Sequence, residues 1–194
     1  MEHLTKPLLL KVLSIAREHS ELHWLAILVG YNHALRAGEI CGQMPSDLTR
    51  LKKPKPRHPG ILPEDVRDGY LTVQRLKGSL KTTQSLIDYQ DNPLLNEREA
   101  LERLARQTAP KTRVFPITRV HLYRVFVRYA ALAGVPEHLQ YTHVVKHTLA
   151  MHSIRDAGIE NVRQYLGHKS IASTGEYLRV SDDAASIAIA TALK

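Results

Sequence analysis

Glycines divide the second half of the sequence into short helical segments, and this pattern restricts the fold more than any other feature of the chain. Apolar residues recur at helical spacing over about 118–133, and the run stops at Gly134. Glycine ends helices because it adopts left-handed backbone angles at little steric cost. Two more glycines, Gly158 and Gly167, separate the segments that follow. These segments are predicted to be short helices over 142–156, 159–166 and 170–179.

The first half of the chain predicts helices on either side of a hairpin. Thr5 can cap a helix that ends near Ser20, and helical spacing of apolar residues continues over 22–34 and 93–107. Polar and apolar residues alternate over 70–75, and the Lys-Gly-Ser turn that follows precedes a second β-prone run. The predicted fold class is therefore mainly α, of the α+β type, with one small antiparallel sheet.

The charge of the chain is strongly positive. Its 194 residues carry a formal net charge of +8, while a hydrophobic content of 43% is that of a globular domain. Such a balance favours a polyanionic partner, with nucleic acid ahead of an anionic membrane. The alternative is a basic surface that is simply solvated.

The single cysteine and the absence of long apolar stretches indicate the compartment. Cys41 is alone, which excludes an internal disulfide and favours a reducing environment. It follows an apolar run, so we expect a small buried residue rather than a nucleophile. The sequence has neither an apolar stretch of about 18 residues nor a leader peptide. It therefore predicts a cytoplasmic, nucleoid-associated protein with no membrane partner.

Several chemistries find little support in the residues. His143 and His147 lie four apart on a predicted helix and could face one metal ion, but no Glu of a zinc-protease motif, Cys pair or carboxylate cluster completes the site. Acidic residues are scattered among basic ones, which does not suit a two-metal nuclease. No glycine-rich phosphate loop is present. The sequence thus predicts neither a metal nor another cofactor.

Cationic and nucleophilic residues stand instead at the ends of predicted elements, at the hairpin turn KGS and within the motifs ALRAGEI, THVVKHT, LGH and GEYLRV. In chain order they are Arg36, Lys77, His143, Lys146, His168 and Tyr177. The series resembles the tyrosine recombinase (phage integrase) family, whose members carry Arg, Lys, His-x-x-Arg, His and Tyr in this order. Glu39, three residues after the first arginine, also matches, and the resemblance covers about 5–180.

The resemblance implies a fold, a partner and an activity. Residues 1–180 would form the helical catalytic domain, and 181–194 a helical tail that docks on a neighbouring protomer or folds back on its own. The partner would be double-stranded DNA, held by a homo-oligomer that is a tetramer on DNA. The expected function is a site-specific recombinase or integrase that cleaves and rejoins DNA through a 3′-phosphotyrosyl intermediate, without a cofactor. The family's separate N-terminal domain is not recognisable, so the chain is expected to be a compact recombinase or a catalytic fragment.

The resemblance also assigns roles to residues. Tyr177 would attack the phosphorus, and three side chains would hold the non-bridging oxygens: Arg36, Lys146 and His168. Lys77, on a hairpin that can dip into the DNA groove, would protonate the leaving 5′-oxygen, with Lys81 as the alternative. His143 would take the tyrosine proton or bind the phosphate. Basic residues of the 51–60 loop are expected to contact the DNA backbone: Lys52, Lys53, Lys55 and Arg57.

One position departs from the family pattern. Lys146 stands where the family has arginine. An arginine fork can hold two phosphate oxygens, whereas lysine is a point charge. Two alternatives therefore accompany the recombinase hypothesis: a weak or inactive DNA-binding relative, and a type IB topoisomerase-like relaxase.

Overall fold

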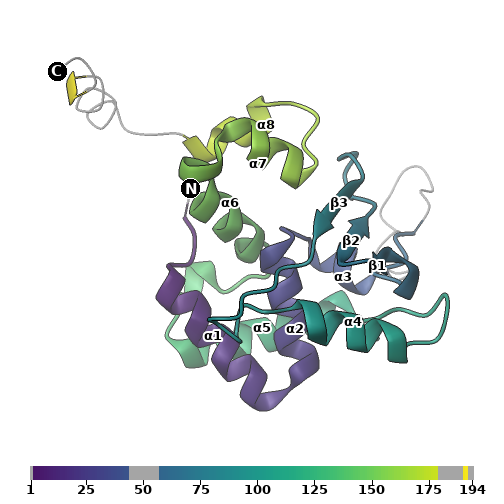
Figure 1. Ribbon diagram of the computed structural model, residues 1–194. Helices are drawn as coiled ribbons and strands as arrows, with labels where there is room; N and C mark the ends of the chain where they lie inside the picture. The colour runs from purple at the N-terminus through teal and green to yellow at the C-terminus, as the bar shows by residue number, and fades with distance from the viewer. Residues whose placement is uncertain (1, 44–56, 179–189, 192–194) are drawn as a thin grey trace, which may run out of the picture.

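The computed structural model describes residues 2–43, 57–178 and 190–191 (Figure 1). As predicted, it is mainly helical with a small antiparallel sheet. The α-helices are α1 (Lys6–His19), α2 (Glu21–Asn32), α3 (Ala37–Cys41), α4 (Arg98–Gln107), α5 (Arg119–Ala133), α6 (His143–Ala157), α7 (Ile159–Leu166) and α8 (Ala172–Gly175). The strands are β1 (Val66–Arg67), β2 (Tyr70–Val73) and β3 (Thr82–Ser85). Short 3-10 turns are η2 (Pro63–Asp65), η3 (Glu137–Leu139) and η4 (Glu176–Leu178).

The helices surround one main core. In Figure 1, α1, α2, α4 and α5 lie together at the base, α6 rises from them towards α7 and α8, and the sheet lies to one side with α3. Leu13, Trp24 and Phe126 are among the side chains buried in this core. A second, smaller cluster lies around α6 and α7 and includes Leu166 and Tyr177. The second cluster gives Tyr177 an apolar surrounding.

Most helix ends follow the predicted signals, but the segment predicted to be one helix over 170–179 forms α8 and then the 3-10 turn η4. The Thr5 side chain accepts a hydrogen bond from Leu8 N, and Gly134 ends α5 with φ 78°. A second difference lies at the start of α4. The segment predicted to be helical from residue 93 begins only at Arg98. The reason is that the carbonyls of Leu94 and Leu95 accept hydrogen bonds from side chains of α2 and hold this segment against it.

The sheet is antiparallel, with the strand order β1-β2-β3 among the described residues. Val73 pairs with Thr82 and Leu71 with Gln84, which confirms the predicted hairpin. Both β1 and α3 lie outside the sequence prediction, because two and five residues are too few to show a periodic pattern. Cys41, in α3, is buried as expected, and burial raises the pKa of its thiol to about 12.

Parts of two predicted segments lie outside the described residues. Lys52, Lys53 and Lys55 of the basic loop belong to them, whereas Arg57 is described and exposed. The predicted tail over 181–194 is described only at Ala190 and Thr191. Across the described stretches of chain, we find no helix with the length and apolar character needed to cross a membrane.

Gly167 is the point where the end of α7 meets the hairpin. Its carbonyl accepts a hydrogen bond from Leu80 N at 2.8 Å, and its φ is 68°. A Cβ atom here would lie 2.6 Å from the Leu80 carbonyl oxygen. Glycine is therefore required both for the left-handed turn and for the close approach. This contact fixes the position of the following residue, His168, relative to the hairpin.

Gly167→Ala should destabilise the protein more than Gly134→Ala. Both glycines end helices with positive φ, but a Cβ atom at Gly134 would meet nothing within 4 Å. Gly134→Ala should cost about 1–2 kcal/mol for the left-handed angle, and Gly167→Ala roughly 1–3 kcal/mol more for the clash. Urea unfolding of both variants measures the difference. Equal losses would contradict the close contact.

Candidate active site

Arg36 lies where α2 turns into α3, and Glu39 holds its side chain. The Arg36 Nη1 atom donates to Glu39 Oε1 at 2.9 Å, and the Arg36 backbone N donates to Glu39 Oε2 at 2.8 Å. Arg36 Nη1 also donates to the Leu76 carbonyl at 3.4 Å. Glu39 is fully buried, whereas the side chain of Arg36 keeps 17% of its exposure. Buried Glu39 thus holds the guanidinium of Arg36, while part of the Arg36 side chain remains exposed at the surface.

Glu39 binds a second arginine from the hairpin. Arg75 Nη1 lies 3.5 Å from Glu39 Oε2, and Leu76 N donates to Glu39 Oε1 at 2.7 Å. Burial would raise the pKa of Glu39, but Arg75, Arg36 and the two backbone donors together lower it. The carboxylate is therefore ionised at neutral pH and connects α3 to the hairpin.

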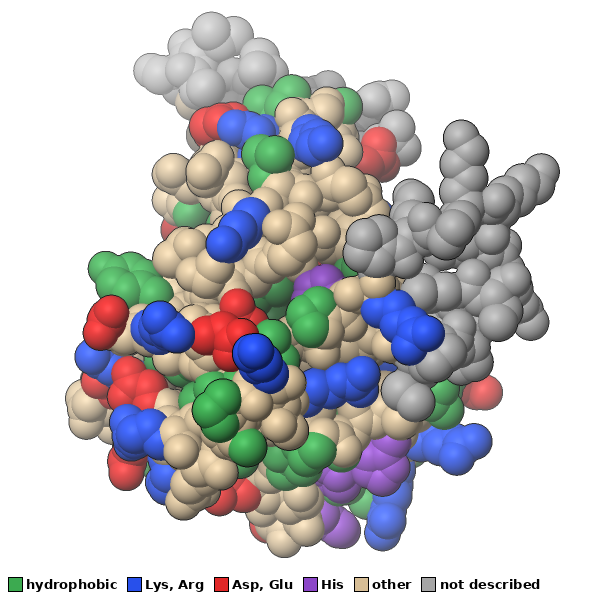
Figure 2. Space-filling view, turned by 90° about the vertical axis from the view of Figure 1, so that its right-hand side faces the viewer, with side chains coloured by type: hydrophobic (Ala, Val, Ile, Leu, Met, Phe, Trp, Pro, Cys, Tyr) green, Lys and Arg blue, Asp and Glu red, His purple; other side chains and the backbone are tan. Residues whose placement is uncertain are grey.

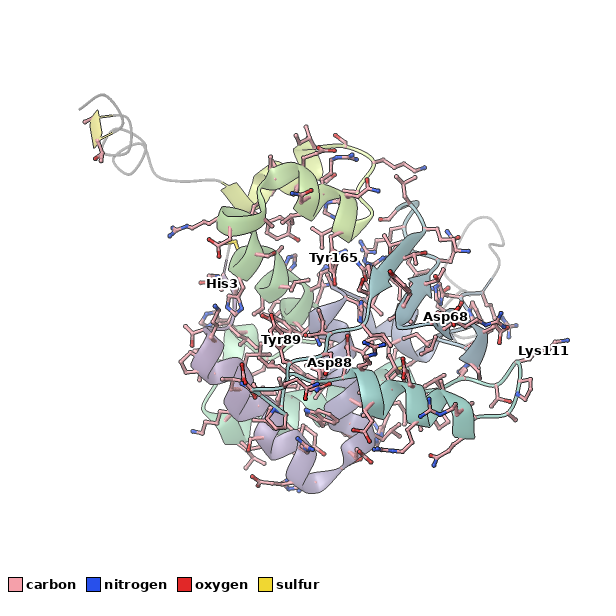
Figure 3. All side chains as sticks on the ribbon, in the orientation of Figure 1. His3, Asp68, Asp88, Tyr89, Lys111 and Tyr165 are labelled. Carbon is pink, nitrogen blue, oxygen red and sulfur yellow. The ribbon has the colours of Figure 1, made fainter. Side chains whose placement is uncertain are left out.

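Arg75 is a structural anchor that the sequence prediction missed. Its Nε donates to Thr82 Oγ1 at 2.9 Å, across the hairpin. Its other nitrogens donate to three carbonyls, those of His33, Ala34 and Tyr165. Tyr165 is a residue of α7 (Figure 3), and its hydroxyl donates to the Asn32 carbonyl at 2.7 Å. The sequence pattern indicated Lys77, two residues after Arg75, because Lys77 lies at the predicted turn. Nothing in the local sequence distinguishes Arg75.

Lys77 and Lys81, the two candidate proton donors, lie on the same turn but face different groups. Both are exposed, and Lys77 has a left-handed φ of 57°. The charge of Lys77 contributes to lowering the pKa of His143 and that of Lys146. The charge of Lys81 instead acts on Asp65 of η2. Lys77 therefore lies nearer to the helix that carries the histidines.

Lys146 lies on α6 and is buried, with only 1% of its surface exposed. Among the residues that the structure describes, its Nζ atom has no hydrogen-bond partner, and the same holds for Arg36 Nε. Burial, and next the charge of Arg36, lower the pKa of Lys146 to about 7, although Glu39 opposes the shift. The amine of Lys146 therefore changes between its charged and neutral forms near neutral pH.

The predicted histidines are neutral at neutral pH. Burial and the nearby His147 lower the pKa of His143 to about 4. Burial and Lys146 likewise lower the pKa of His168 to about 4, and its Nδ1 lies 2.9 Å from Thr174 Oγ1. Neutral imidazoles can each donate one hydrogen bond and accept another.

Tyr177 lies in η4, with 6% of its surface exposed. Its hydroxyl lies 3.0 Å from Nδ1 of His147, a residue of α6. Burial raises the pKa of Tyr177, while the charge of Arg36 lowers it. The sequence prediction considered His147 only as half of a metal pair, and it gave His143 two alternative roles, taking the tyrosine proton or binding the phosphate. The spacing of four from His143 was the one signal that could have drawn attention to it.

One charge connects the whole site. Arg36 lowers the pKa of Lys146 and of Tyr177, and it acts in the same way on three histidines: His143, His147 and His168. Segments far apart in the sequence thus converge at this site. They are the α2–α3 bend, the hairpin, α6 and η4. On the face shown in Figure 2, Lys and Arg side chains are scattered over the surface, and acidic side chains lie mostly towards its left. Among the residues that the structure describes, no group of three or more metal-ligating side chains comes together.

Comparison with known proteins identifies the fold through structure. No protein-family model and no curated protein matches the sequence. A lambda integrase tetramer bound to a Holliday junction is similar with a TM-score of 0.66 and 19% identity, covering 93% of this chain and 50% of that one. The lambda integrase catalytic core gives 0.61 and 19%, covering 87% and 92%, and XerA recombinase gives 0.66 and 18%, covering 98% and 63%. This chain therefore spans about half the length of the integrase in the tetramer.

The lowered pKa of Lys146 predicts a pH-dependent cost of burying it. In the unfolded chain the amine keeps its proton up to about pH 10.4, whereas in the fold it loses it near 7. The folded state then binds fewer protons, so stability rises with pH above about 7. Lys146→Met removes the cost of burying the amine, so its free energy of unfolding should exceed that of the unsubstituted protein. This difference should shrink by about 2–3 kcal/mol between about pH 6 and pH 9. Urea unfolding measures it, with the exposed Lys81→Met as control; a constant advantage would contradict the burial of a neutral amine.

Proposed function

We propose that this chain, which has the fold of the tyrosine recombinase catalytic domain, is a site-specific DNA recombinase that cleaves and rejoins DNA through a 3′-phosphotyrosyl intermediate. The proposal depends chiefly on Tyr177, whose hydroxyl is hydrogen-bonded to a neutral imidazole within a cluster of cations. A tyrosine that only packed in the core would need no such surroundings. In the proposal, Tyr177 is the nucleophile that attacks the phosphorus.

The cations of the cluster would stabilise the transition state. Negative charge grows on the non-bridging oxygens as the phosphorus becomes five-coordinate, and fixed donors in a partly buried site stabilise it. Arg36 Nε and Lys146 Nζ are buried donors without a protein partner, and His168 completes the set. Phosphate oxygens are acceptors that such donors bind. A bound phosphate would also raise the pKa of Lys146 and keep it charged.

Lys77 would donate the proton to the departing 5′-oxygen. It lies exposed at the turn of the hairpin, and its charge acts on His143 and Lys146, whereas that of Lys81 acts on Asp65. Arg75 anchors the base of the same hairpin. The hairpin would therefore present Lys77 to the scissile phosphate, and Lys81 remains the alternative donor.

The partners we propose are double-stranded DNA and further copies of this chain. One of the similar solved structures is a lambda integrase tetramer bound to a Holliday junction. The formal charge of +8 suits the DNA backbone. Backbone contacts are assigned to Arg57 and to the loop lysines Lys52, Lys53 and Lys55. Residues 1–180 would act as the catalytic domain and 181–194 as the tail that docks on a neighbouring protomer.

Tyr177→Phe should abolish covalent attachment to DNA and leave DNA binding intact. The assay uses duplexes with a nick close to the cleavage site. The short fragment that carries the free 5′-hydroxyl then diffuses away, so the covalent adduct is trapped, and denaturing gels detect it. The duplexes carry random sequences, and the duplexes that the protein cleaves identify the sequence that it recognises. Tyr89→Phe is the matched control, because Tyr89 is 53% exposed and should cleave as the unsubstituted protein does. An adduct that survives in Tyr177→Phe would identify another nucleophile.

Lys146→Arg should raise the rate of cleavage by about tenfold, because an arginine fork engages two phosphate oxygens where lysine offers one charge. Single-turnover rates on the trapped substrate measure it. Lys146→Gln should reduce the rate, and Lys11→Arg, at an exposed position of α1, is the surface control. An unchanged rate in Lys146→Arg would mean that lysine already suffices at this position.

A second candidate is a DNA-binding relative without cleavage activity. The burial of Lys146 Nζ favours it, because a buried amine must move to reach a phosphate. DNA binding without an adduct in any variant would support this candidate. Relaxation of supercoiled DNA without strand exchange would instead support a type IB topoisomerase-like activity.

A further inference from the structure

We propose that His147 holds the hydroxyl of Tyr177 and accepts its proton when the tyrosine attacks DNA. The inference rests on the proposed function and adds to it a residue outside the motif series that carries the family resemblance. Its basis is one contact, in which His147 Nδ1 lies 3.0 Å from the Tyr177 hydroxyl. Within the described residues, no other hydrogen-bond partner of this hydroxyl is recorded.

The contact gives His147 the geometry of a base. If the Tyr177 hydroxyl donates to Nδ1, the hydrogen of the neutral ring is on Nε2, and the Nδ1 lone pair faces the proton to be removed. The two ring centroids lie 5.8 Å apart, so the rings also pack against each other. Because α6 fixes the backbone of His147 and the second core cluster surrounds Tyr177, the pair is held before DNA arrives.

The surroundings keep His147 able to accept a proton. Burial first, and then the charges of Lys146 and Arg36, lower the pKa of His147. The ring is therefore neutral at neutral pH. Burial has the opposite effect on Tyr177, whose pKa it raises, so the phenol needs a base close by. A neutral imidazole within hydrogen-bond reach meets this need.

His143 is less suited to the same task. Its ring meets the ring of His147 edge-on, with centroids 4.6 Å apart and planes at 79°. Burial first, and then His147 and the charges of Arg36, Lys146 and Lys77, lower the pKa of His143 to about 4, which makes it a weak base. His143 and His147 lie one helical turn apart on α6, and only His147 is hydrogen-bonded to the hydroxyl. This leaves His143 for the phosphate, the second of the two roles predicted for it.

The step is balanced in both directions. On cleavage, the Tyr177 O–H bond breaks, the proton moves to His147 Nδ1, the Tyr177 oxygen bonds to phosphorus, and the bond from phosphorus to the 5′-oxygen breaks. The leaving oxygen takes its proton from Lys77. On rejoining, a 5′-hydroxyl gives its proton to Lys77 as its oxygen bonds to phosphorus, the bond from phosphorus to the Tyr177 oxygen breaks, and His147 returns its proton to that oxygen. No water, metal ion or redox partner takes part in this exchange of protons.

The test compares substrates whose leaving atom is oxygen or sulfur. A bridging 5′-sulfur leaves as a thiolate and needs no proton donor, so it rescues loss of the donor but not loss of the base. His147→Gln should slow adduct formation by about 100-fold or more on both substrates. Lys77→Met should slow it only on the oxygen substrate. The rate of His147→Gln should also recover in part as the pH rises, since hydroxide then ionises the phenol.

Two further variants separate proton transfer from positioning and from local packing. His147→Asn keeps a polar group near the position of Nδ1 but is no base, so it should be as slow as His147→Gln. His143→Gln, one helical turn away, should show no recovery at high pH. Circular dichroism and DNA retardation establish that each variant folds and binds.

The outcomes distinguish this inference from the proposed function. No adduct with the unsubstituted protein would refute the recombinase proposal itself. An adduct with normal rates in His147→Gln would overturn only the role of His147. Normal rates in His147→Asn alone would show that the contact positions Tyr177 without taking its proton. Faster cleavage in either variant would show that the contact restrains the tyrosine, and would also overturn the inference.

Discussion

The buried carboxylate of Glu39 is the interaction on which the rest of the site depends. It binds Arg36 and Arg75 and accepts hydrogen bonds from the backbone N–H groups of Arg36 and Leu76. A buried charge is stable only when it is paired and hydrogen-bonded in this way. The same carboxylate therefore orients the arginine of the site and anchors the hairpin. Arg75 carries the connection further, to the end of α2 and to α7.

Partial burial among cations sets the protonation states of the site. Burial, and after it the nearby charged groups, lower the pKa of His143, His147 and His168, so all three rings are neutral at neutral pH. Burial raises the pKa of Tyr177, which keeps the hydroxyl protonated at neutral pH. A polyanion would change this balance, because a phosphate beside Lys146 favours its charged form. One carboxylate, Glu39, is shared by Arg36 and Arg75, so the site keeps a net positive charge that an anion would complement.

The order of motifs and the helix boundaries could be predicted from the sequence, because both depend on neighbouring residues. Glycine and threonine signals placed the ends of α1, α5, α6 and α7 to within two residues. The late start of α4 could not be predicted, since it depends on tethering of Leu94 and Leu95 to α2, 63 or more residues away. The strand β1 and the helix α3 were also missed, because they are too short to show a period.

The sequence by itself determined which residues could form the site: their types, their order and the lysine at position 146. Only the tertiary structure decided which of them meet. It placed Lys146 below the surface without a partner, made Arg75 an anchor, and put His147 rather than His143 against Tyr177. The reason is physical, because hydrogen bonding and burial depend on distances between segments that lie far apart in the sequence. On α6, a single helical turn separates His143 from the histidine that Tyr177 contacts.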